Sequence, residues 1–307
     1  MLSSKDFIHP VDAAALSKLE KIPGFPALVK KVMELGWEQY NYGVYTASYI
    51  KLSDKQLPNI HNKLVNLSVK FGIRTPDLFL EMNPTPNAYT TGDTRTMIIV
   101  TSGLIEGFTD EEINAVLAHE CGHIICHHVL YNTLVQYLIN GALQTGWISN
   151  LATLPLQIAL LYWSRMSELS CDRVAAIATS PETALSMLAR LAGGPYNITK
   201  DINFEAWAEQ ANEYDLISND GFANKTMQTW ATMFKGHPFT AVRVRELLKW
   251  CASKEYWDAK NNLEDISLLN TNKSSTNVGN YCPNCKKIVS EDWEYCIFCG
   301  HNLKNNC

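Results

Sequence analysis

The chain has 307 residues, of which 46% are hydrophobic and 10% aromatic, so it holds enough apolar material for a folded core and is not a disordered chain. Its 31 acidic and 26 basic residues give a net charge of −5, which excludes a uniformly basic surface and argues against general nucleic-acid binding. The nine cysteines are an odd number, and residues 1–21 contain no apolar run typical of a signal peptide. These two features predict reduced thiols or metal ligands in a cytoplasmic protein.

The first part of the chain predicts helices around a few short strands. Apolar residues recur with a helical period in 28–35 and in 59–70, and a glycine follows each run. Short apolar runs at 78–80 and 97–100, separated by turn residues, predict strands. Thr109, followed by three acidic residues, has the form of a helix N-terminus. The helix that begins there is expected to extend over about 109–128.

The stretch from Val129 to Ser164 contains no charged residue. Because it lies between two candidate metal-binding segments, it is expected to form two antiparallel helices, hinged near Gly146. About 17 residues per arm is the lower limit for crossing a bilayer. The first arm also carries a polar stripe, formed by Asn132, Gln136, Asn140 and Gln144. A hairpin in solution or on a membrane surface is therefore favoured, with a membrane-spanning hairpin as the alternative.

Further helices are expected at 184–191, 204–211 and 241–250. Residues 270–280 are polar, without an apolar period, and are interpreted as a linker. The chain is thus expected to divide into a main domain over 1–269, this linker, and a small cysteine-rich module over 281–307.

The clearest functional signal is a pair of histidines four residues apart, His119 and His123, in the pattern HExxH. Histidines at this spacing lie on one face of a helix, so both imidazoles can bind one metal ion. Glu120 is not placed as a ligand, but it can take a proton from a water that zinc has made acidic. The apolar helix around the motif favours a zinc site over a chance match.

A catalytic zinc requires a third protein ligand and one open coordination position. Glu168 is the favoured third ligand, and Asp172, one helical turn further on, would orient a ligand histidine. A pair of carboxylates on a solvated helix face is the alternative. His127 is a weaker candidate ligand, because it is four residues after His123. Cys171 is expected to be a small buried residue, although oxidation next to the zinc site is conceivable.

These motifs together resemble the gluzincin peptidases of metallopeptidase family 48, which includes the bacterial membrane peptidase HtpX and the CAAX prenyl endoprotease. The resemblance extends from about residue 10 to about residue 250. It implies an α+β fold that is mainly helical, a zincin-like domain with a small sheet. It also implies site roles: His119, His123 and Glu168 as ligands of a catalytic zinc, Glu120 as general base, Asp172 behind a ligand, and Asn87 and His237 in contact with the substrate or the developing oxyanion.

Four cysteines near the C-terminal end form two CxxC pairs separated by ten residues: Cys282, Cys285, Cys296 and Cys299. Four thiolates close a tetrahedron around one structural zinc, as in a zinc ribbon. Such a short module cannot build an adequate core, so the metal would supply its folding energy. Its balanced charge favours contact with protein over nucleic acid.

The sequence therefore predicts a zinc-dependent metalloendopeptidase with one catalytic and one structural zinc. Its expected substrates are proteins or peptides, with protein quality control as one setting. No nucleic-acid partner is expected, and residues 129–164 are a candidate for association with a membrane surface. The alternative is a non-catalytic zinc-binding regulatory or interaction protein that has kept a peptidase fold.

Overall fold

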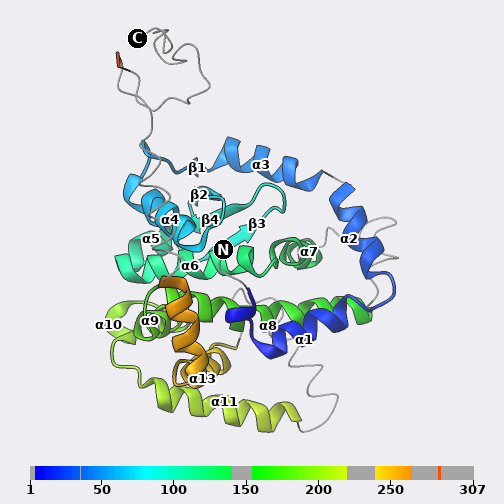
Figure 1. Cartoon of the computed structure of the whole chain (residues 1–307), viewed down its shortest axis with the longest axis vertical. Coiled ribbons are helices and arrows are strands. Elements are labelled where there is room, and N and C mark those ends of the chain that lie inside the picture. Colours follow the sequence, from blue (N-terminus) through cyan, green and yellow to red (C-terminus); the bar gives the residue numbers. More distant parts are fainter. Residues whose placement is uncertain (1–3, 35, 140–153, 220–238, 265–282, 285–307) are drawn as a thin grey trace.

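A computed structural model describes residues 4–34, 36–139, 154–219, 239–264 and 283–284 (Figure 1). Helices dominate this part of the chain, and the strands form one small sheet, which confirms the expected α+β class. The elements before the sheet's central strands are a 3-10 turn and four helices: η1 (Ser4–Asp6), α1 (Pro10–Leu19), α2 (Phe25–Glu34), α3 (Trp37–Ser48) and α4 (Pro58–Phe71).

The sheet has four strands: β1 (Ile50–Lys51), β2 (Asp77–Glu81), β3 (Ala88–Thr91) and β4 (Met97–Thr101). Their spatial order is β1-β2-β4-β3. The two predicted strands, β2 and β4, are parallel neighbours at its centre, while β1 and β3 pair antiparallel to them on the two sides. The short strand β3 is therefore an edge strand, in register with β4 through pairs such as Tyr89 and Ile99.

A tight turn joins β3 to β4 and is held by α3. Gly92 begins the turn with φ +88°, and a Cβ on it would lie 2.1 Å from the carbonyl oxygen of Arg95, so only glycine fits. The carboxylate of Glu38 accepts hydrogen bonds from the backbone N–H groups of Asp93, Thr94 and Arg95 at 2.6–3.0 Å. These contacts fix the C-terminal end of β3 relative to helix α3.

The remaining helices follow the sheet: α5 (Ser102–Gly107), α6 (Asp110–Ile125), α7 (Val129–Ile139), α8 (Leu154–Ala178), α9 (Pro181–Gly193), α10 (Tyr196–Thr199), α11 (Phe204–Asn219) and α13 (Thr240–Cys251). Residues 254–264 are also helical. Helix α6 is central, with α4 and β3 on one side and α8 and α9 on the other (Figure 1). The main apolar core forms around it, and a second core joins α1, α2, α7 and the first half of α8.

The uncharged stretch 129–164 contributes α7 and the beginning of α8, which pack against each other. Its expected hinge falls within 140–153, outside the described residues. Helix α8 continues without a break beyond Ser164 to Ala178, so the second arm is the first part of a longer helix. Across the described ranges, no helix is both long and apolar enough to cross a membrane.

Candidate active site

Helix α6 carries both histidines of the HExxH motif on its buried side. Thr109 caps the helix, and the reciprocal bonds between Thr109 and Glu112 form the capping box that the sequence indicated. His119 and His123 are 2% and 4% exposed, and one turn of helix separates them. Their rings are 5.2 Å apart between centroids. The two histidines therefore lie on one face of α6, as their spacing predicted.

The carboxylate of Glu168, on α8, lies between the two imidazoles. Its Oε2 is 3.4 Å from Nε2 of His119, and its Oε1 is 3.3 Å from Nε2 of His123. Zinc binds such atoms at about 2.0–2.1 Å, and the edges of a regular tetrahedron with those bond lengths are about 3.3–3.4 Å. Each nitrogen–oxygen distance falls in that range, with a different carboxylate oxygen facing each histidine, so the three side chains lie close enough to share one zinc.

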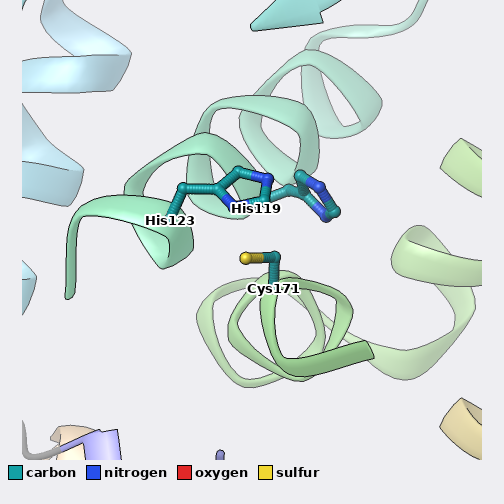
Figure 2. Close-up of side chains that lie close together, drawn as sticks. All are labelled: His119, His123 and Cys171. Carbon is teal, nitrogen blue, oxygen red and sulfur yellow. The ribbon is translucent and has the colours of Figure 1, made fainter. Parts of the chain in front are cut away.

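Cys171 offers a second grouping with the same histidines. Ligand atoms of His119, His123 and Cys171 all lie within 4.8 Å of one another, and Figure 2 shows the thiol of α8 facing the two rings of α6. Burial raises the pKa of the Cys171 thiol well above its ordinary value. We favour Glu168 as the third ligand, because its two oxygens lie 3.4 and 3.3 Å from the two Nε2 atoms.

The second ring nitrogen of His119, Nδ1, is held by Asp172, which forms a buried ion pair with Arg243. Asp172 places Oδ1 3.1 Å from Nδ1 of His119, which leaves Nε2 directed at Glu168. Arg243, on α13, donates to both oxygens of Asp172 at 2.7 and 2.6 Å and lies 2.9 Å from Glu168. Although burial opposes ionisation of Asp172, the adjacent Arg243 keeps the pKa of Asp172 below the ordinary value. Burial also opposes protonation of His119, but the two carboxylates raise its pKa to about 10 in the absence of metal.

Glu120 is held by the edge strand of the sheet. The hydroxyl of Thr90, on β3, donates to Oε2 of Glu120 at 2.6 Å, and Glu120 is 2% exposed. A small cavity lies beside it, lined by residues of β3, α6, α9 and α13: Ala88, Val116, His119, Glu120, Met187, Leu191 and Arg243. The proposed base, a histidine ligand and the edge strand thus border one space.

The C-terminal end of α6 differs from the expected boundary near residue 128. The helix ends at Ile125, because His127 takes a left-handed conformation with φ +59°. The N–H of His127 then bonds to the carbonyl of Ile124, and that of His128 to the carbonyl of His123, as in a Schellman motif. His127 is exposed, so it does not share the buried face of the two ligand candidates, whereas His128 is fully buried.

Two groups of predicted site residues are not placed together with this cluster. His237 and the four cysteines of the expected ribbon lie outside the described residues. Asn87 lies one residue before β3, where its backbone pairs with Thr101 of β4. Sequence reasoning missed the roles of Thr90 and His128. It weighed Arg243 as an anchor for carboxylates near the site against a solvent-facing residue, and left it out of the site.

A buried HExxH helix, a glutamate from a second helix between its histidines, and an adjoining edge strand define a zinc metallopeptidase. Comparison with known proteins gives the family. Residues 54–251 match the profile of Peptidase family M48, and the chain belongs to this family.

Three relatives illustrate the similarity. The chain is 35% identical over 260 residues to the plastoglobule-localized metallopeptidase 48, chloroplastic, of Arabidopsis thaliana, covering 83% of this chain and 75% of the relative. It is 28% identical over 226 residues to the protease HtpX homolog of Tropheryma whipplei strain Twist, covering 64% and 74%. It is 30% identical over 224 residues to the protease HtpX of Legionella pneumophila, covering 62% and 77%. No solved structure matches the chain.

The chain is thus a zinc-dependent protease that hydrolyses peptide bonds in protein or peptide substrates. The relatives carry protease names, and the non-catalytic alternative receives no support from them.

Proposed function

We propose that His119, His123 and Glu168 hold the catalytic zinc and that Glu120 is the general base of peptide hydrolysis. The observation that carries this assignment is the position of Glu168, whose two oxygens lie at tetrahedral-edge distances from the two Nε2 atoms. Asp172 fixes the ring of His119 from behind, and Arg243 forms ion pairs with both Glu168 and Asp172 in this buried place.

When bound, zinc would acidify a water and polarise the scissile carbonyl. Glu120 takes the proton from the attacking water at its carboxylate and later transfers it to the leaving nitrogen. The hydroxyl of Thr90 holds one carboxylate oxygen of Glu120, so the orientation of the base is fixed before the substrate binds. Asn87 and His237 are proposed to contact the substrate or to donate to the developing oxyanion.

An extended substrate would align with β3. This strand is at the edge of the sheet, and its residue Thr90 contacts the proposed base. Backbone pairing with an edge strand binds a peptide largely independently of its side chains, which suits a protease acting on protein substrates. Asn87, just before the strand, would be near one end of such a peptide.

The assignment is tested by replacing Glu120 with Gln in the full chain. E120Q should retain zinc at the wild-type level and lose cleavage of unfolded casein, because an amide cannot take the proton. The matched control is E111Q, which changes an exposed glutamate of the same helix and should cleave normally. A chelator should abolish cleavage by the wild type. Wild-type turnover by E120Q would refute the proposed role.

A second zinc is proposed in the segment 281–307, bound by Cys282, Cys285, Cys296 and Cys299, with 270–280 as a linker after the domain 1–269. The CxxC spacing of the sequence supports it. Truncation at about residue 270 should then lower the zinc content from two per chain to one. If the ribbon only recruits substrates, the truncated protein should still cleave a short peptide. An unchanged zinc content after truncation would exclude the second site.

A further inference from the structure

Behind His123 lies a row of buried polar side chains that the proposed mechanism does not use. Nδ1 of His123 is 3.3 Å from Nδ1 of His128, and Nε2 of His128 is 3.1 Å from Oδ2 of Asp12. The side chains of His128 and Asp12 are both 0% exposed. Asp12 belongs to α1, which precedes the segment 54–251 that matches the family. The row thus links the HExxH helix to an N-terminal helix outside the family match.

The two members of this row that lie behind His123, namely His128 and Asp12, are held in place by further hydrogen bonds. The Schellman turn at the end of α6 directs the chain back, so that the N–H of His128 bonds to the carbonyl of His123 at 2.8 Å. Asp12 accepts hydrogen bonds from the hydroxyl of Ser170 at 2.6 Å and from the indole N–H of Trp163 at 3.1 Å. Although burial opposes its ionisation, the bonds from His128, Ser170 and Trp163 keep the pKa of Asp12 below the ordinary value.

Hydrogen-bond chemistry favours one placement of protons along this row, in which Nδ1 of His128, also 3.8 Å from the Cys171 thiol, accepts from His123. A histidine that binds metal through Nε2 carries its proton on Nδ1, and that N–H requires an acceptor. Nδ1 of His128 can accept it only if the proton of His128 is on Nε2. The carboxylate of Asp12 lies 3.1 Å from this Nε2, within ion-pair distance.

We propose that Asp12, acting through His128, holds His123 in the tautomer and orientation that present Nε2 to the catalytic zinc. His128 and Asp12 are positioning residues, and the proposal rests on the assignment of His123 as a zinc ligand made above. The arrangement parallels the direct contact of Asp172 with His119, with one imidazole inserted between the ligand and the carboxylate.

Asn132 is the competing partner of His123. Its amide nitrogen lies 3.1 Å from the same Nδ1, but an NH₂ group donates and cannot accept the proton that a zinc-bound histidine carries there. Only a half-turn of the amide would present its oxygen instead. The experiment therefore includes N132L, which removes this amide and leaves the row intact.

The test measures zinc affinity by chelator competition and the visible absorption of cobalt in the same site, using the full chain. H128L removes the acceptor and should lower zinc affinity by about 10- to 100-fold, the range for lost partners of metal-bound histidines, with an altered cobalt spectrum. H128N keeps an acceptor near the position of Nδ1 and should restore part of the affinity. D12N should fall between H128N and the wild type, because it weakens only the outer contact.

The matched control is S170A. It removes one hydrogen bond to Asp12 but leaves the row from Asp12 to His123, so zinc affinity should stay within about threefold of the wild type. A zinc loss caused only by weaker packing would appear in S170A as well as in D12N. The zinc that the double variant H119A/H123A still binds measures the contribution of any other site in the chain.

Wild-type zinc affinity and an unchanged cobalt spectrum in H128L would overturn the proposal, and so would a loss confined to N132L. If H128L does not fold, D12N against S170A decides: equal zinc affinity in these two variants also refutes it. Failure of the underlying assignment has a different signature. In that case the single variant H123A would itself keep the zinc of this site.

Discussion

Gly122 of α6 packs against Cys171 of α8, between the two helices that carry the proposed zinc ligands. A Cβ on Gly122 would lie 3.0 Å from Cα of Cys171 and 3.2 Å from its Cβ and Sγ. The nearest atom is backbone, so it cannot move aside as a flexible side chain would. In G122A the helices must separate by about 0.5–1.0 Å to restore ordinary carbon contacts of about 3.5–4.0 Å.

Two opposing effects set the stability of G122A. Alanine in place of glycine in a helix interior stabilises by about 1 kcal/mol. Overpacking of a close contact costs about 1–3 kcal/mol. The free energy of unfolding should therefore fall by about 0–2 kcal/mol. Zinc affinity should fall further, by at least about tenfold, because the same separation lengthens the distances from Glu168 to the histidines beyond the tetrahedral edge.

The assay compares thermal unfolding of the zinc-free protein with zinc affinity from chelator competition. G43A is the matched control, since Gly43 is in helix α3 and an added Cβ meets no atom within 4 Å. It should stabilise by about 1 kcal/mol and leave zinc binding unchanged. If G122A stabilised as much as G43A and bound zinc with wild-type affinity, the close contact between α6 and α8 would be refuted.

Three further predictions each concern the loss of a single side-chain contact. T90V should lower kcat/KM by about tenfold, the loss of one orienting hydrogen bond to Glu120, and T90S should restore it in the same casein assay. T109A removes the cap of α6 and should lower the free energy of unfolding by about 1 kcal/mol in a denaturant titration, with unchanged turnover well below the melting temperature. Polar contacts with His9, Arg245 and Lys249 depress the pKa of Glu246 to about 2, so its stabilisation is present above the unfolded value of 4.5 and is lost as the pH falls toward 2. E246Q should therefore lower the free energy of unfolding at pH 7 by less than about 1 kcal/mol, because Glu246 is partly exposed, and a difference from the wild type that does not narrow below pH 4.5 would contradict this.

Local patterns predicted the elements that carry the proposed chemistry. The cap at Thr109 and the spacing of His119 and His123 were readable, because helix initiation and helix faces depend on residues a few positions apart. The central strands β2 and β4 were readable for the same reason, since both are buried apolar runs. The two-residue strand β1 was not, because it is too short for a periodic pattern.

Contacts between distant segments could not be predicted in this way. Asp12 meets Ser170 across 158 positions and Arg243 meets Asp172 across 71, and no local pattern specifies either pair. The boundary of α6 was also misjudged. A left-handed turn normally favours glycine, and here His127 adopts it, so the usual signal for the end of a helix is missing.

Helix α8 is unbroken from Leu154 to Ala178, so a small rotation about its first residue displaces Glu168. At 1.5 Å per residue its 25 residues extend over about 37 Å, and Glu168 stands about 21 Å from the end at Leu154. A tilt of only about 3° about that end displaces Glu168 by about 1 Å, half the length of a zinc–oxygen bond. The second core, which holds the start of this helix, therefore bears on the position of Glu168 from a distance.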